Sequence, residues 1–225
     1  KMHITGPYLE GKGAFTPQMH QLRGPEDARK TVEFWADQGV TWFKAYMNIT
    51  RAELGAAIEA AHQRGLKVTA HLCAVTFREA AALGIDDLEH GLSEDTEFLP
   101  DKTPDVCPAQ RRANVELLAN LDIAGEPVRR TIRELVEKKV ALTSTLPVFE
   151  TFVANRPPLQ QRVLDAMTAD ARVSYLATRA KIGEDAKSPW PGALKKEMEF
   201  ERAFAAAGGL LVTGLDPTGY GGVVA

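Results

Sequence analysis

Short apolar segments alternate with longer segments of helical periodicity along most of the chain. The short segments are rich in β-branched and aromatic residues, which is typical of buried strands. They predict strands at residues 3–8, 40–45, 66–71, 86–90, 140–145 and 210–215.

The longer segments between these strands predict helices, and several carry clear start and stop signals. Thr50 with Glu53, and Thr76 with Glu79, match the Thr-x-x-Glu capping box. A proline opens and a glycine closes the first long segment, as is usual for helices. Helices are expected at residues 25–38, 50–64, 76–84, 110–120, 126–138, 159–184 and 192–207, with long loops at 91–109 and 146–158.

The repeated strand–helix–strand order indicates a parallel sheet with helical crossovers, and hence an α/β fold. An open doubly wound sheet and a closed barrel both satisfy this order. A dinucleotide-binding sheet would show a Gly-x-Gly-x-x-Gly turn after an early strand, and the sequence contains neither that motif nor a Walker A motif.

Composition is that of an ordinary globular protein, with 225 residues, 44% hydrophobic and 25% charged. This length suits a single domain spanning residues 1–225. The net charge of −3 gives no reason to expect nucleic acid or an anionic membrane as partner. No apolar stretch approaches the length of a membrane span.

The sequence has two cysteines, Cys73 and Cys107. Two are too few for a disulfide framework, and no Cys-x-x-Cys pair suggests a zinc knuckle or a redox site. We therefore expect both cysteines to serve packing.

The candidate chemistry lies at the ends of the predicted strands. Lys44, His71 and His90 stand at the ends of three successive strands, and Asp216 follows the last one. In (β/α) barrels the carboxyl ends of the strands meet at one mouth, where active sites are built. We expect these four side chains to converge there.

Strand alternation supports this expectation. Thr69 and His71 share one face of their strand, opposite an apolar face suited to covering helices. Each residue alone also has an ordinary structural interpretation: a hydrogen-bonded histidine, a lysine reaching for water, or an aspartate starting a turn. The four positions taken together favour a functional site.

Two histidines and a carboxylate suit zinc or a similar divalent cation. Such an ion lowers the pKa of a bound water to about 7 and makes hydroxide available near neutral pH. The sequence therefore predicts metal-assisted hydrolysis.

Residues 39–92 resemble the amidohydrolase superfamily, particularly its imidazolonepropionase-like and prolidase-like branch. The most specific segments are HQRGLKVTAH and LEHG, and LLVTGLDPTGYGG is similar to the family's eighth strand. The resemblance implies a TIM-like (β/α)8 barrel that hydrolyses an amide bond of a small or peptide-like substrate.

The same resemblance implies a role for each candidate. Lys44 occupies the position of a lysine that is often carbamylated and bridges two metal ions. His71 and His90 match the histidines that bind one metal. Asp216 matches an aspartate that binds the other metal and transfers the proton of the attacking water. Tyr46 faces the same way as Lys44 and is a candidate for substrate contact.

The sequence departs from the family pattern at one point, because no His-x-His pair is present. A complete barrel usually needs about 250 residues. We therefore expect an incomplete barrel that contains strands three to eight and lacks the first two. Two alternatives stay open: a Schiff-base enzyme that uses Lys44, and an inactive barrel scaffold. Homo-oligomerisation is also left open.

Overall fold

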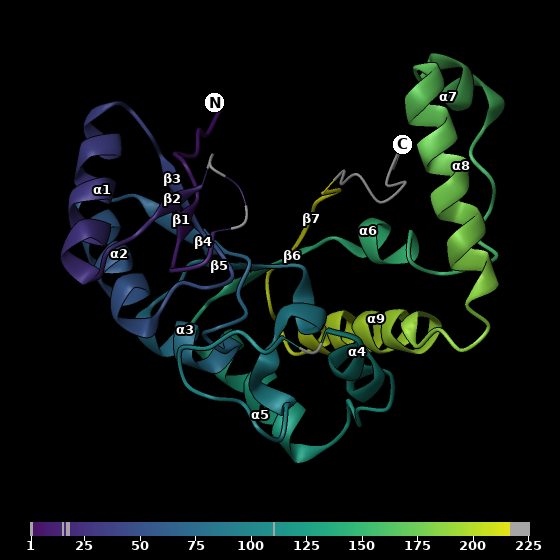
Figure 1. Cartoon of the computed structure of the whole chain (residues 1–225). Helices are drawn as coiled ribbons and strands as arrows, with labels where there is room; N and C mark the ends of the chain where they lie inside the picture. Colours follow the sequence, from purple (N-terminus) through teal and green to yellow (C-terminus); the bar gives the residue numbers. More distant parts are fainter. Residues whose placement is uncertain (1, 15, 17–18, 110, 217–225) are drawn as a thin grey trace.

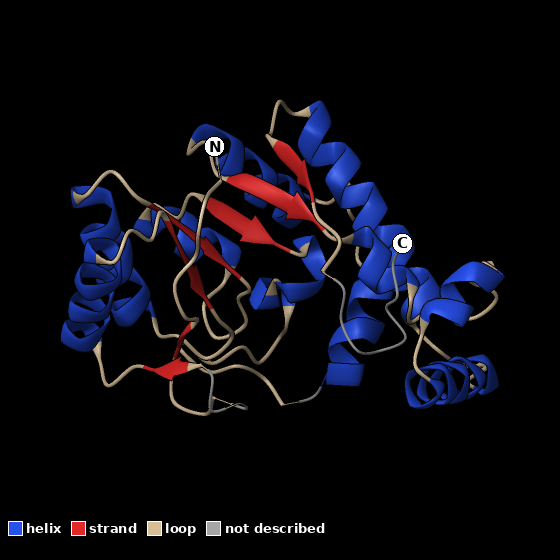
Figure 2. Cartoon of the chain, turned by 90° about the horizontal axis from the view of Figure 1, so that it is seen from above, coloured by secondary structure: helices blue, strands red, loops and turns tan. Residues whose placement is uncertain are grey.

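The computed structural model describes residues 2–14, 16, 19–109 and 111–216. Seven strands form one parallel sheet in the order β2-β1-β3-β4-β5-β6-β7. Figure 2 shows these strands crossing the middle of the molecule. Their bounds are β1 Leu9–Glu10, β2 His20–Gln21, β3 Trp42–Ala45, β4 Lys67–Ala70, β5 Asp87–Glu89, β6 Ala141–Ser144 and β7 Leu211–Thr213.

Most helices lie along the outer side of this sheet (Figure 1). They are α1 Pro25–Asp37, α2 Arg51–Gln63, α3 Phe77–Leu83, α4 Arg111–Ala119, α5 Glu126–Glu137, α6 Leu146–Glu150, α7 Gln161–Ala166, α8 Ala169–Glu184 and α9 Trp190–Ala206, with the short 3-10 turns η1 Gly91–Glu94 and η2 Thr96–Phe98. The pair α7 and α8 stands to one side of the sheet (Figure 1).

Local signals in the sequence account for the central elements. Both predicted capping boxes are present, at Thr50 with Glu53 and at Thr76 with Glu79. The apolar faces of the strands meet the helices in one core, in which Phe43, Val68 and Leu88 are fully buried. Burial of such side chains is the main stabilising contribution to a fold of this kind.

The sheet is open in the part of the chain that the structure describes, with β2 and β7 at its edges. The prediction of a parallel α/β sheet is confirmed, whereas a closed barrel is not. No helix among the described residues is both long enough and apolar enough to span a bilayer.

Several element predictions were wrong. Residues 3–8 form no strand; Thr5 makes only an isolated bridge to Trp42. The two short strands β1 and β2 follow instead. The helix expected over 159–184 is two helices, because Thr168 leaves the helical conformation and caps α8 by accepting from the Ala171 amide. Part of the loop expected at 146–158 is helix α6.

The packing role expected for the cysteines is also corrected. Cys73 and Cys107 form a disulfide, with their Cα atoms 5.0 Å apart. The bond links the turn after β4 to the loop that follows η2.

Candidate metal centre

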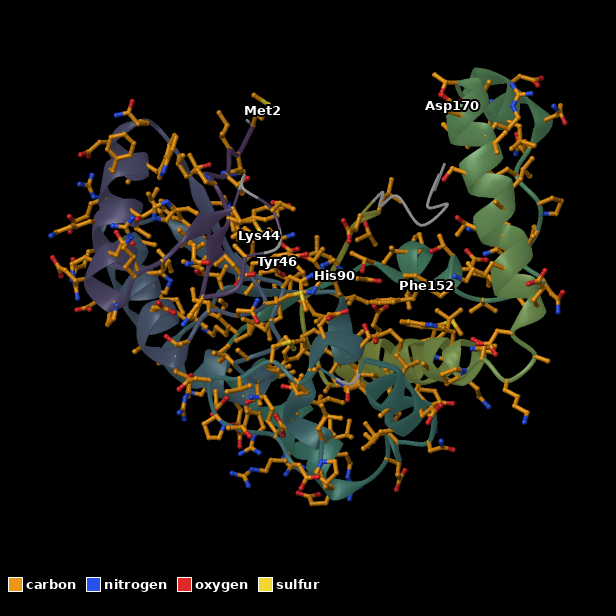
Figure 3. The ribbon with its side chains drawn as sticks, viewed as in Figure 1. Met2, Lys44, Tyr46, His90, Phe152 and Asp170 are labelled. Atoms are coloured by element: carbon orange, nitrogen blue, oxygen red, sulfur yellow. A yellow bond between two sulfur atoms is a disulfide. The ribbon has the colours of Figure 1, made fainter. Side chains whose placement is uncertain are left out.

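Parallel pairing brings the predicted site residues to one end of the sheet. Lys44 lies opposite Thr69 in the register of β3 and β4, and Thr69 lies opposite Asp87 in that of β4 and β5. His71 and His90 each directly follow their strands. Figure 3 shows Lys44, Tyr46 and His90 close together near the middle of the molecule.

The two histidines are in contact. The ring centroids of His71 and His90 are 4.4 Å apart in an edge-to-face arrangement. Asp216 lies beside this pair, with its Oδ2 atom 3.7 Å from Nδ1 of His90. Three of the four predicted residues therefore meet, although the last of them is more than a hundred residues away in sequence.

Burial sets the protonation state of the His90 ring, and a hydrogen bond orients it. The ring is 3% exposed, and its Nδ1 atom lies 2.8 Å from Oγ1 of Thr145. Burial lowers the pKa of His90 to about 4, with the neighbouring His71 acting in the same direction. The imidazole is thus neutral near pH 7 and offers a lone pair, as a metal ligand must.

His71 has a carboxylate partner that the sequence analysis did not identify. Its Nε2 atom lies 3.2 Å from Oε2 of Glu94, which belongs to η1. Each of these side chains is largely shielded from solvent. The carboxylate can therefore orient the ring of His71.

Lys44 forms an ion pair with Glu89. The other carboxylate oxygen of Glu89 accepts a hydrogen bond of 3.0 Å from the Thr69 hydroxyl. Both a carbamate and a Schiff base require the lysine as a free amine. The structure places Lys44 at the site, paired with the carboxylate of Glu89.

A second buried carboxylate lies one step further down the same face of β5. Asp87 accepts hydrogen bonds from the hydroxyls of Thr69 and Thr143. Burial raises the pKa of Asp87 to about 6, against the lowering effect of these bonds. The inner face of the sheet is therefore a connected polar network.

Aromatic rings flank the histidines on both sides. Tyr46 lies 4.7 Å from His71 between ring centroids and stacks on Tyr8 at 5.3 Å. Burial, with Tyr8 adding to it, raises the pKa of Tyr46 to about 12, so its hydroxyl keeps its proton. On the other side Phe149 lies 6.5 Å from His90.

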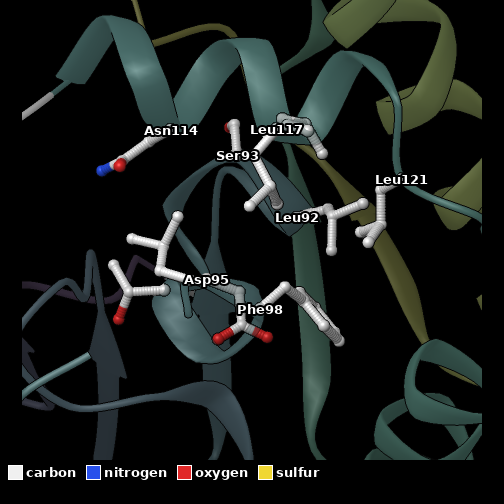
Figure 4. A pocket seen from close by; sticks show the side chains of 10 residues that line it. Leu92, Ser93, Asp95, Phe98, Asn114, Leu117 and Leu121 are labelled. Carbon is white, nitrogen blue, oxygen red and sulfur yellow. The ribbon is translucent and has the colours of Figure 1, made fainter. Parts of the chain in front are cut away.

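A separate small pocket lies beside η1 and is mostly apolar (Figure 4). Leu92, Phe98 and Leu117 line it together with Asp95. None of the predicted site residues lines it, so we place the chemistry at the strand ends instead.

The donors gathered at the strand ends fit a zinc-like ion in chemical type, since they are imidazoles and carboxylates. Within the described residues, however, no group of three or more His, Cys, Asp or Glu side chains is arranged to hold an ion. The donors therefore match zinc in chemical type and lie near one another, but the two contacting histidines are not part of a complete set of ligands.

Known proteins match this chain in structure but not in sequence. No family model and no curated protein sequence matches the chain. Solved structures do match. Bottromycin amidohydrolase has a TM-score of 0.61 at 19% identity over 94% of this chain and 45% of its own.

Two further structures give similar values. One is an amidohydrolase with a TM-score of 0.55 and 14% identity, covering 96% of this chain and 48% of its own. The other is a provisionally named prolidase from Bifidobacterium longum, with a TM-score of 0.53 and 18% identity, covering 95% and 44%. The chain has the fold of part of these amidohydrolases. It spans a little under half the length of each.

Sequence reasoning missed Asp87 and Glu89 although a signal was available. In the segment Asp87–Glu89 the two acidic residues alternate with buried Leu88, so period-two alternation assigns them to the face of Thr69. Glu94 carried no such signal, because the turn of η1 that brings it to His71 is not periodic.

Proposed function

We propose that this chain carries a hydrolytic site of the amidohydrolase type, at which His71 and His90 bind a divalent cation. The observation that carries the proposal is the contact of the two imidazoles at 4.4 Å, with Asp216 beside them. The fold shared with amidohydrolase structures supports it. Zinc is the ion that this donor chemistry favours.

Each residue has a distinct role in the proposal. His71 and His90 hold the ion, and Asp216 both binds metal and accepts the proton of the attacking water. Tyr46 contacts the substrate and, as a neutral phenol, donates a hydrogen bond. When bound, the cation would supply Lewis acidity and bring the pKa of water close to neutrality.

The proposal includes a carbamate on Lys44 as a further metal ligand. As a carbamate it would add a negatively charged oxygen ligand and complete the set for one or two ions. Its ion pair with Glu89 must first be released, because the ammonium cannot react with carbon dioxide. The carbamate therefore competes with Glu89 for the same nitrogen.

The proposed substrate is a small amide or a peptide-like molecule, as in the imidazolonepropionase-like and prolidase-like branch. The rings of Tyr46 and Phe149 on either side of the histidines suit a substrate with a flat or apolar group next to the scissile carbonyl.

Equilibrium dialysis against zinc followed by elemental analysis tests the proposal. We expect the purified chain to bind zinc, and His71→Ala and His90→Ala to weaken binding at least a hundredfold. His62→Ala is the matched control, because His62 lies on α2 and pairs with Asp86 away from the site. Absence of zinc from the wild type, or equal losses in all three variants, would overturn the proposal.

A further inference from the structure

The chain makes an unusual turn directly after β5. His90 and the next residue, Gly91, both have left-handed backbone conformations, with φ of 71° and 72°. For a residue with a side chain this conformation is strained, because Cβ approaches the following carbonyl oxygen. Other contacts must therefore hold His90 in place.

Glu197 of α9 makes those contacts. Its Oε1 atom accepts a hydrogen bond of 2.7 Å from the Leu92 amide, and its Oε2 atom accepts one of 2.7 Å from the Ser93 amide. Hydrogen bonds to a carboxylate are stronger than those between neutral groups. Both carboxylate oxygens are thus engaged by the turn that begins at His90.

The fit between Glu197 and this turn is close. A Cβ atom on Gly91 would lie 1.9 Å from Oε1 of Glu197, far inside van der Waals contact. Gly91 is therefore required twice, for its positive φ and for the approach of the carboxylate. Helix α9 packs directly on η1, as Figure 1 also shows.

Glu197 is almost completely buried at this contact. The side chain is 1% exposed, and it has no ion pair with a cationic side chain among the described residues. Burying a carboxylate without a cation is costly unless its hydrogen bonds are strong and well directed. A helix that served packing alone would favour an apolar residue there.

We propose that Glu197 is a positioning residue for His90. By accepting hydrogen bonds from the amides of Leu92 and Ser93, it fixes the turn that orients the His90 imidazole toward His71. This inference rests on the proposed function for its consequence, since a fixed imidazole matters most for holding a cation. In this proposal Glu197 acts on the turn and touches neither ion nor substrate. Mutation of residues that orient metal ligands commonly lowers metal affinity by about 10- to 100-fold.

The test compares Glu197→Gln with Glu201→Gln. Glutamine keeps the size of the side chain but has only one acceptor oxygen, so one of the two amides loses its partner. Glu201 is the matched control, because it is also a buried carboxyl on α9 and bonds Ser144 rather than the turn.

The first measurement uses the metal-free protein. In Glu197→Gln we expect hydrogen exchange of the Leu92 and Ser93 amides to accelerate at least tenfold and the His90 imidazole resonances to shift. In Glu201→Gln both should stay as in the wild type. Unchanged exchange and unchanged resonances in Glu197→Gln would overturn the inference, whether or not the chain binds metal.

The second measurement is the zinc dissociation constant, which we expect to rise at least tenfold in Glu197→Gln and to stay within twofold in Glu201→Gln. Wild-type zinc affinity in Glu197→Gln would overturn the positioning role. Failure of the wild type to bind zinc counts against the proposed function alone, and the metal-free measurement then decides the inference. If Glu197→Gln does not fold, Glu197→Asp replaces it, with smaller shifts expected in the same direction.

Discussion

Two neighbouring strand ends carry the two central histidines, and the structure holds them by different means. The turn after β4, which follows His71, is tied by the disulfide from Cys73 to Cys107, a residue 34 positions later. The turn after β5 is held by hydrogen bonds to Glu197, 105 positions beyond Leu92. One restraint is covalent and responds to reductants. The other is electrostatic and responds to loss of a carboxylate.

The two turns also differ in backbone. The β5 turn needs left-handed residues and a close approach that excludes any side chain. The β4 turn is held by further hydrogen bonds to its carbonyls, from the Thr96 hydroxyl to Cys73 and from the Lys102 ammonium to Ala74, each 2.7 Å long. In the β5 turn the amides of Leu92 and Ser93 both bind one carboxylate, whereas three distant residues, Thr96, Lys102 and Cys107, hold the β4 turn.

The largest expected effect is that of Gly91→Ala, which should break the β5 turn. We expect a loss of about 2–5 kcal/mol in the free energy of unfolding, from the positive φ and the clash with Glu197 together. Gly39→Ala has a positive φ with nothing within 4 Å, so it should lose only about 1–2 kcal/mol. Urea denaturation measures both, and equal losses would show that the contact with Glu197 contributes nothing.

Removing the disulfide should loosen the β4 turn. For a loop of this length we expect reduction, or Cys107→Ser, to lower the free energy of unfolding by about 2–4 kcal/mol. Denaturation with and without reductant measures the effect. The Cys107→Ser variant must not respond to reductant, and a wild type equally stable in both conditions would contradict the prediction.

A pH titration of stability distinguishes the buried network of β5 from these restraints. The pKa of Asp87 is raised to about 6 in the folded chain from an ordinary value of 3.8. The folded state therefore binds the proton more tightly, and the stability of the wild type should fall as pH rises through about 4 to 6. Asp87→Asn removes this dependence. We expect the difference in free energy of unfolding between the wild type and Asp87→Asn to change by about 2–3 kcal/mol between pH 4 and pH 7.

The smallest expected effect concerns the ring of His90 itself. Thr145→Val removes the hydroxyl beside Nδ1 and should cost about 1 kcal/mol of stability. It should also change the tautomer balance of His90, seen in its imidazole nitrogen shifts. Thr151→Val is the control, because that buried hydroxyl donates to the nearby Val148 carbonyl. Identical His90 shifts in both variants would show that Thr145 does not orient the ring.

Local signals in the sequence predicted much of the frame. The strand that contains Lys44 and the strands that end just before His71 and His90 were found because apolar runs and capping boxes are properties of a few adjacent residues. Residues 3–8 were wrongly predicted as a strand, because their pairing amounts to an isolated bridge between Thr5 and Trp42. The break before α8 at Thr168 was missed, although threonine is a good N-cap.

The long-range parts of the site could not be predicted in the same way. The pairing of Cys73 with Cys107 depends on a Cα separation that only the folded chain sets. Glu197 had no signal, because a glutamate in an amphipathic segment is normally assigned to the solvent side. Its role appears only when α9 is packed on η1.

The contact between Gly91 and Glu197 has a consequence for how this sequence can change over time. A methyl group at position 91 would clash with the carboxylate of Glu197 in addition to the strain that the positive φ imposes. Substitutions at these two positions should therefore be epistatic, and a double-mutant cycle should reveal their coupling. Shortening residue 197 first would remove the clash with a side chain at position 91. Substituting Gly91 first would pass through an unstable intermediate sequence.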